Sequence, residues 1–312
     1  MKRRGTIRVI TSSAAVATAA LAMSAAAVAA PSASVSIRFA AVNGSAPVSC
    51  ATPIAGLGTS SATAALQDLR FYVSNVRLVR ANGTSVPLKP AGSKAFNLVA
   101  KGNRTTLIDL ENGKGACNQG DAATNAVIRG TVPKGRYVGA RMYVGVPFPL
   151  NHTDITTAPA PLDLAAMAWS WQSGRKFMKV ELADPAGAAG TWQTKAYMVH
   201  LGSTGCTGNP AAGGDVDCSA SNRVPLRFAR FNPATQKIAF DVGALVAGTD
   251  VTRNGGGAPG CMSGATDPEC GPVFGHLGLH LAAQPGMGED MPGMMHGMQA
   301  PSGQTVFRVV AR

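Results

Sequence analysis

The most constraining feature of this sequence is a series of short segments in which apolar and polar residues alternate, bounded by glycine, proline or asparagine. Alternation of this kind, as in 34–41 and 69–79, is typical of half-buried β-strands. Asn82-Gly83 then supplies a hairpin turn before the returning segment 84–88. Further strands are expected at 124–131, 136–146, 176–182, 195–201, 224–231, 237–242 and 305–310.

Short strands with turns between them predict an all-β fold, an antiparallel β-sandwich with long loops held by disulfides. The chain contains 37 Gly and 20 Pro and only 14% charged residues, a composition that disfavours a coiled coil or a helical bundle. Its 46% apolar residues can build a core, which argues against disorder. Short helices are expected only at 60–66 and 243–246. No shift of composition divides residues 30–312, so we expect one domain there.

The first 29 residues have the organisation of a secretory signal peptide. A basic start with Lys2, Arg3 and Arg4 leads into an Ala-rich apolar run, which ends in Ala-Val-Ala before Ala30. An uncleaved membrane anchor is the alternative, but hydroxyl residues dilute the run. No other stretch has the length and apolarity of a membrane span. We therefore expect a periplasmic or secreted protein with no membrane span after signal cleavage.

Six cysteines in an exported chain favour disulfides. A four-Cys zinc site is the alternative, but it would need close CxxC pairs, and the sequence has none. Fifteen pairings are formally possible. Local spacing favours joining neighbours across two polar loops and then the remaining pair, which gives Cys206 with Cys218, Cys261 with Cys270, and Cys50 with Cys117.

The five histidines include two beside long loops. His152 lies in a turn-rich segment after a strand, and His200 ends the expected strand 195–201. Two such imidazoles can converge on one metal ion, although isolated surface or capping histidines are the alternative. His276 and His280 would share a face of a helix or of a strand, and the surrounding glycines favour a strand or loop. They are secondary metal candidates.

Two of the three tryptophans, Trp169 and Trp171, are two residues apart, so in an extended strand they point to one face. An aromatic pair in the core or at the rim of the sandwich is the alternative. An indole has no lone pair available for a metal ion. Either ring would have to be chemically altered before it could become a ligand.

A methionine-rich segment near the C-terminus sits among glycines and prolines, which predicts an accessible loop. Thioether sulfurs with an imidazole suit copper(I), and the alternative is a loop without a specific ligand. The secondary metal candidates in this segment are Met291, Met294, Met295, His296 and Met298.

Four ordered motifs together resemble the MbnP family. They are Phe-Tyr-Val-Ser-Asn-Val-Arg-Leu at 71–78, Gly-Val-Pro-Phe with Asn-His at 145–152, Trp-Ser-Trp-Gln-Ser-Gly with Lys-Phe at 169–177, and His-Leu-Gly-Ser-Thr-Gly-Cys at 200–206. Members of this family are exported copper-binding proteins found with methanobactin operons and elsewhere. They are also described as the four-Cys member of a metallo-mystery pair.

The resemblance implies a copper site and a partner. In the family, a diheme enzyme of the cytochrome c peroxidase and MauG type oxidises a tryptophan to kynurenine, whose aryl amine donates to copper beside histidine imidazoles. Carried onto this chain, Trp169 or Trp171 would be the modified residue, with Trp169 slightly favoured. His152 and His200 would be the imidazole ligands.

The remaining function classes are less well supported. The formal net charge is +12, but the basic residues are scattered and an exported protein meets no chromosome, so nucleic-acid binding is not expected. No nucleophile elbow, phosphate loop or His-Glu-x-x-His motif occurs, so we expect a binding protein and not an enzyme. A mononuclear copper oxidase and a metal-free structural or adhesion sandwich remain the alternatives.

Overall fold

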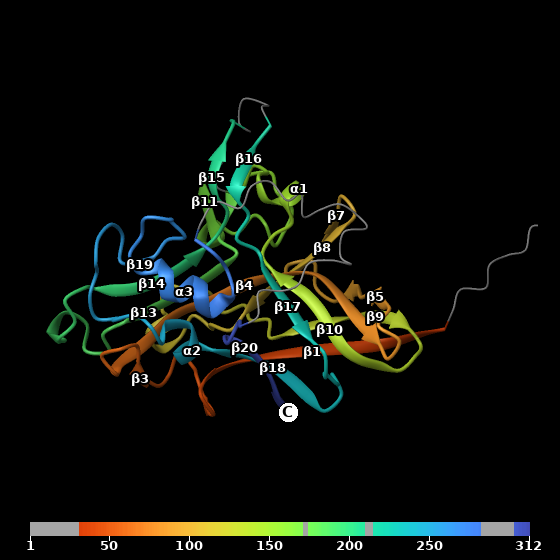
Figure 1. The fold of residues 1–312 in the computed structure, drawn as a ribbon, viewed down its shortest axis with the longest axis horizontal. Helices are drawn as coiled ribbons and strands as arrows, with labels where there is room; N and C mark the ends of the chain where they lie inside the picture. The colour runs from red at the N-terminus through yellow and green to blue at the C-terminus, as the bar shows by residue number, and fades with distance from the viewer. Residues whose placement is uncertain (1–30, 171–173, 210–214, 282–302) are drawn as a thin grey trace, which may run out of the picture. The chain divides into compact units, whose positions relative to one another are not determined.

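The computed structural model describes residues 31–170, 174–209, 215–281 and 303–312. One long strand, β4 (Ala62–Arg80), organises the larger of its two main sheets (Figure 1). This sheet runs in the order β17 (Val224–Phe228), β10 (Tyr137–Val144), β4, β13 (Met178–Ala183), β14 (Ala196–Leu201) and β19 (Gly260–Cys261). The strands β3 (Ile54–Leu57), β5 (Ser85–Pro87) and β8 (Asn103–Asp109) also pair with β4, and β7 (Asn97–Ala100) pairs with β8.

The smaller main sheet is built around the first strand of the described chain. Its order is β20 (Phe307–Ala311), β18 (Gln236–Asp241), β1 (Ser32–Asn43), β9 (Val127–Pro133) and β6 (Lys89–Ala91), with β2 (Ala46–Pro47) paired to β1. Two short hairpins are separate from both sheets, β11 (Ala168–Ser170) with β12 (Gly174–Arg175), and β15 (Thr204–Thr207) with β16 (Asp217–Ala220).

An aromatic cluster joins the two main sheets. Phe71 of β4 stacks on Phe240 of β18 at a centroid distance of 5.5 Å and meets the edges of Phe39 and Phe307 at 5.6 and 5.5 Å. All four rings are buried, and each such pair contributes about 0.5–1.5 kcal/mol beyond its area burial. Because Phe71 belongs to one sheet and its partners to the other, the fold is the predicted β-sandwich.

The predicted antiparallel arrangement holds for most strand pairs but not for all. β1 pairs with β18 in parallel, and β14 pairs with β19 in parallel. Both pairs join strands that are distant in sequence, and long connections permit parallel pairing. Apolar alternation gives the face of a residue and carries no information on strand direction, so the sequence pattern missed this.

Two local predictions were wrong. The helix expected at 60–66 is instead the start of β4, because Ala64 pairs with Ile54 of β3 and Leu66 pairs with Leu182 of β13. His276 lies in a helix, α3 (Cys270–Leu277), and not in a strand or loop. The two glycines of this helix, Gly271 and Gly275, occupy exposed positions, while Val273 and Phe274 between them are buried. The helix expected at 243–246 is confirmed as α2 (Val242–Val246).

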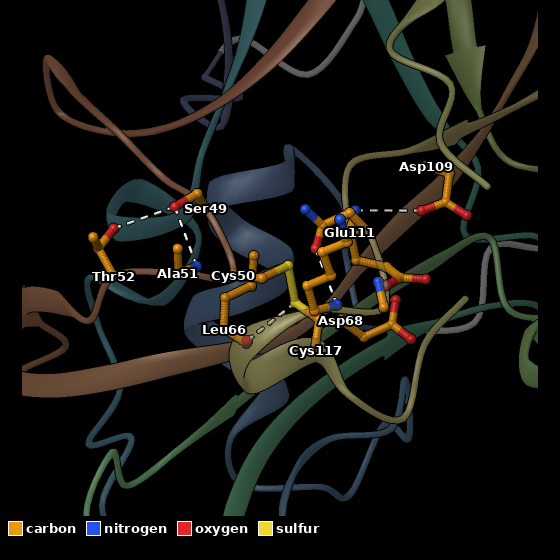
Figure 2. Close-up of a disulfide and its surroundings, with 12 residues drawn as sticks. Ser49, Cys50, Ala51, Thr52, Leu66, Asp68, Asp109, Glu111 and Cys117 are labelled. Atoms are coloured by element: carbon orange, nitrogen blue, oxygen red, sulfur yellow. Dashed lines mark hydrogen bonds between the residues drawn. A yellow bond between two sulfur atoms is a disulfide. The ribbon is translucent and has the colours of Figure 1, made fainter. Parts of the chain in front are cut away.

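The three disulfides have the predicted pairing. Cys50–Cys117, Cys206–Cys218 and Cys261–Cys270 are all formed. Cys50–Cys117 ties the loop before β3 to a 3-10 turn, Gly115–Cys117, and lies beside the Leu66 carbonyl of β4 (Figure 2). Because it closes 67 residues, a chain-entropy argument gives it about 4 kcal/mol of stability.

Several predicted features lie outside the described residues. These are the signal peptide at 1–29, Trp171, and the methionine-rich candidates Met291, Met294, Met295, His296 and Met298. In the part of the chain that is described, no helix has the length and apolarity needed to cross a membrane.

Candidate functional site

Four segments that carry the sequence motifs meet at one end of the larger sheet. They are the short helix α1 (Phe148–Asn151) with His152, the β11–β12 hairpin, the residues 202–203 that follow β14, and the β15–β16 hairpin. Figure 1 shows α1, β11, β15 and β16 gathered at the top of the view. Hydrogen bonds of Asn151 with Arg175 and Ser203, and the contact of His152 with Cys218, bring these distant parts of the sequence together.

Asn151 holds three of these segments together. Its side chain is fully buried, and its Oδ1 accepts a hydrogen bond from the backbone N–H of Arg175 over 2.8 Å. Its Nδ2 donates to Ser203 Oγ over 3.4 Å. Gly174 makes this approach possible, because it has a φ of +75° and a Cβ there would lie 2.5 Å from Asn151 Oδ1. The buried amide of Asn151 thus anchors the site, and Gly174 allows the β11–β12 hairpin to approach it.

His152 directs its ring toward the β15–β16 hairpin. Its Nε2 lies 3.2 Å from Asn151 Nδ2 and 3.5 Å from Sγ of Cys218. Because an amide nitrogen can only donate, Nε2 accepts this bond, which places the ring proton on Nδ1. The Nε2 lone pair of His152 therefore faces the Asn151 amide, beside the Cys206–Cys218 disulfide.

Trp169 of β11 packs its indole against the backbone at Gly202. A Cβ on Gly202 would lie 2.7 Å from Cζ3 of Trp169 and 3.0 Å from the Arg175 carbonyl oxygen. Such distances are below normal van der Waals contact, so only glycine permits this approach. The fold thereby fixes the half-buried Trp169 next to the segment that joins His200 to Ser203.

His200 is bound to a carboxylate. Its Nε2 lies 2.8 Å from Oε1 of Glu181, which also lies 3.1 Å from the ammonium of Lys179. Burial alone would raise the pKa of Glu181, but the hydrogen bond with His200 and the charge of Lys179 outweigh it and lower this pKa to about 2. Burial lowers the pKa of His200, and the bond to Glu181 opposes that shift only in part.

His200 is therefore a neutral imidazole whose Nε2–H donates to an ionised carboxylate, with Nδ1 left as the lone-pair nitrogen. This is the arrangement in which metal-binding histidines are usually found, with the second ring nitrogen donating to a carboxylate. The backbone of His200 also connects to the loop cluster, because Ser263 Oγ donates to the His200 carbonyl and accepts from Gly202 N–H over 2.9 and 3.1 Å.

The predicted ligands thus have different immediate neighbours. His152 contacts the Cys206–Cys218 disulfide, Trp169 contacts Gly202, and His200 contacts Glu181. Among the described residues, the clusters of three or more His, Cys, Asp and Glu side chains with ligand atoms within 4.8 Å do not include one that holds both His152 and His200. Their convergence on one ion stays a prediction.

The secondary histidines lie on another element. His276 is in the last turn of α3, with Nδ1 3.4 Å from Thr305 Oγ1, and His280 is exposed beyond the helix. Neither belongs to a described cluster of potential metal ligands.

An acidic cluster that the sequence analysis missed surrounds the buried Arg70. Asp109, Glu111 and Asp121 approach one another within 4.8 Å, and Arg70 Nη1 lies 3.7 Å from Glu111 and 3.5 Å from Asp121. Figure 2 shows Asp109 and Glu111 near the Cys50–Cys117 disulfide. Burial raises the pKa of Asp109 to about 8, with Arg70 opposing it. The sequence signal that could have indicated this cluster is the pair of acidic residues Asp109 and Glu111, two positions apart at the end of β8.

Together the fold and this end of the sheet define a disulfide-bonded β-sandwich protein whose loops carry His152 and Trp169 and whose adjoining strand β14 carries His200. The MbnP family model matches residues 32–263, and the chain belongs to the MbnP family. The structure of MbnP from Methylosinus trichosporium is similar, with a TM-score of 0.74 and 32% sequence identity over 90% of this chain and 99% of that chain. No curated protein matches the chain.

Proposed function

We propose that this protein is an exported copper-binding protein whose site combines His152, His200 and a kynurenine made from Trp169. Membership of the MbnP family connects the chain with methanobactin operons. The observation that carries the proposal is the packing of Trp169 on Gly202, which lies two residues after His200. The next residue, Ser203, accepts a hydrogen bond from Asn151, the neighbour of His152.

The donor chemistry of these residues fits copper. The Nε2 atom of His152 and the Nδ1 atom of His200 are the ring nitrogens that carry lone pairs in the arrangement described above. At His152 the copper would replace the hydrogen bond that Asn151 Nδ2 donates. Neutral imidazoles bind copper well, and the Glu181 carboxylate would orient the ring of His200 and increase its basicity. When bound, copper would supply an electrophilic, redox-active centre.

An unmodified Trp169 cannot complete this set, because its indole nitrogen only donates hydrogen bonds. Conversion to kynurenine cleaves the C2–C3 bond of the indole, adds two oxygen atoms, and after hydrolysis releases the former C2 as formate. The product carries a free aryl amine in place of the ring nitrogen. The two oxygen atoms would come from one dioxygen molecule, or from two hydrogen peroxide molecules that leave as water, activated by a diheme partner of the cytochrome c peroxidase and MauG type.

Export fits the covalent structure of the chain. Disulfides persist in the periplasm or outside the cell and are rare in a reducing cytosol, and this protein forms three of them. We expect the copper site to work in acquisition or homeostasis of the metal, without turnover of a substrate.

The test compares two tryptophan variants of the protein produced together with the diheme partner. Trp169→Phe is expected to abolish stoichiometric copper binding, whereas Trp192→Phe, at a tryptophan that is also half-buried but outside the motifs, is expected to keep it. Equal copper content in both variants would overturn the role of Trp169. Oxygen consumption in the presence of a reductant would instead identify a copper oxidase. Absence of copper from the unmutated protein would favour the metal-free structural or adhesion protein.

A further inference from the structure

The Cys206–Cys218 disulfide differs from the other two in its exposure. Cys50, Cys117, Cys261 and Cys270 are 6%, 0%, 1% and 0% exposed. Cys206 and Cys218 are only half-buried and lie in the β15–β16 hairpin, which projects beside α1 in Figure 1. A reductant in solution therefore reaches this disulfide before the other two.

This accessible disulfide lies against an imidazole. The Sγ atom of Cys218 is 3.5 Å from Nε2 of His152, and the ligand atoms of His152, Cys206 and Cys218 all lie within 4.8 Å of one another. While the disulfide is intact, its sulfurs are poor metal ligands. Once reduced, the same three side chains are two thiols and an imidazole, which is a donor set for thiophilic ions such as Zn²⁺.

We propose that reduction of the Cys206–Cys218 disulfide creates a His-Cys₂ site for a thiophilic metal ion of the Zn²⁺ type, formed by His152, Cys206 and Cys218. A dithiol reductant gives two electrons and two protons to the disulfide, leaving two cysteine thiols and its own oxidised disulfide. Binding of Zn²⁺ then releases the two thiol protons. The metal forms bonds to both thiolates and to His152 Nε2, whose lone pair exchanges the hydrogen bond from Asn151 Nδ2 for the metal.

The hairpin keeps the two thiols together after reduction. Cys206 and Cys218 are register partners, and the pairs Thr204–Ala220 and Thr207–Asp217 flank them in the same antiparallel ladder. With Zn–S bonds of about 2.3 Å in tetrahedral geometry, the two sulfurs have to separate to about 3.8 Å. Side-chain rotation provides this movement without a break in the ladder.

The bound cation itself favours the thiolates, since a thiol that coordinates a metal ion is deprotonated. Three protein ligands leave a fourth position open for water, as in zinc sites that are not purely structural. This site goes beyond the proposed function and needs no kynurenine. Because it uses His152, its occupation would compete with copper at the proposed copper site.

The experiment uses the full chain produced without the diheme partner, so that its outcome is independent of tryptophan oxidation. The protein is reduced with limiting dithiothreitol, desalted without oxygen and titrated with Co²⁺ as a spectroscopic substitute for Zn²⁺. Alkylation and peptide mass mapping identify the cysteines that were reduced. We expect label only on Cys206 and Cys218, and one Co²⁺ per chain with thiolate-to-cobalt charge-transfer absorption that Zn²⁺ removes.

Two variants separate this site from adventitious binding. His152→Ala is expected to weaken Co²⁺ and Zn²⁺ binding by at least about tenfold, because it removes one of three ligands. His280→Ala, at an exposed histidine outside the cluster, is expected to bind like the unmutated protein. The proposal is overturned if the buried disulfides are reduced first, if Co²⁺ binds without charge-transfer absorption, or if His152→Ala leaves the affinity unchanged.

Discussion

Asn151 and Arg175 are joined by a reciprocal pair of hydrogen bonds. Asn151 Oδ1 accepts from the Arg175 backbone N–H over 2.8 Å, and the Arg175 guanidinium donates through Nη1 to the Asn151 carbonyl over 2.6 Å. Both side chains are buried. This pair fixes the helix that precedes His152 to the hairpin that carries Trp169, so it controls the geometry of the whole site.

Asn151→Ala is expected to destabilise the protein by about 1–3 kcal/mol, because it leaves the buried Arg175 N–H without its acceptor. Copper binding should fall with it, since His152 and Trp169 lose their common anchor. Urea unfolding and copper analysis measure the two effects. Asn118→Ala, at an exposed asparagine, should change the unfolding free energy by less than about 0.5 kcal/mol. Equal stability of the two variants would contradict the anchoring role of Asn151.

Gly202→Ala is expected to displace the Trp169 ring, because the added Cβ would lie 2.7 Å from Cζ3 of that ring. We predict reduced tryptophan oxidation by the diheme partner and a copper content well below that of the unmutated protein. Peptide mass spectrometry measures the tryptophan oxidation, and copper analysis measures the copper content. Gly275→Ala is the control, since nothing lies within 4 Å of a Cβ there. Full oxidation and copper loading of Gly202→Ala would show that ring placement is unimportant.

Glu181→Gln is expected to weaken copper binding by about 10- to 100-fold, the usual effect of losing a carboxylate that orients a metal-binding histidine. The amide keeps the shape of the side chain but removes the charge that accepts from His200 Nε2–H. Competition with a copper chelator of known affinity measures the change. An affinity equal to that of the unmutated protein would mean that His200 does not bind the metal.

Asp109 gives a pH dependence of stability. Its pKa is about 8 in the folded protein and about 3.8 without the fold, so the native state binds more protons between these values. The stabilising contribution of protonated Asp109 to the unfolding free energy is fully present below pH about 4. It is lost as the pH rises through about 8, at no more than about 1.4 kcal/mol per pH unit.

Asp109→Asn removes this titration. Between pH 5 and pH 8 the unfolding free energy of the variant should therefore gain about 1–4 kcal/mol relative to that of the unmutated protein. Urea unfolding at several pH values measures the difference. Glu181, with a pKa of about 2, titrates below this window and is the same in both proteins. A difference that does not change with pH would refute the raised pKa of Asp109.

Residue alternation predicted most of the strands and the faces that they bury, because it reports directly on which side chains enter the core. Phe39 and Phe71, for example, lie in predicted strands and meet between the sheets. Residue alternation does not predict which strands pair with one another. The Ala-rich start of β4 was expected to be helical, and only its contacts with β3 and β13 make it a strand.

The prediction of the candidate site depended more on the resemblance to the MbnP family than on local sequence patterns. Spacing singled out His152, His200 and Trp169 but did not indicate the carboxylate partner of His200, since Glu181 lies on a neighbouring strand. It also did not place Cys218 beside His152, because that contact joins residues 66 positions apart. Such contacts follow from the topology, which local periodicity does not encode.

The central claim is that Trp169 becomes a kynurenine that binds copper with the histidines. The most direct measurement is peptide mass spectrometry combined with copper analysis on one sample of protein purified from its native host. The tryptic peptide 142–175 contains Trp169 and Trp171 and no other tryptophan. We predict near-stoichiometric copper and, at Trp169 in fragment spectra, a net gain of one oxygen and loss of one carbon. Stoichiometric copper with both tryptophans unmodified would contradict the account.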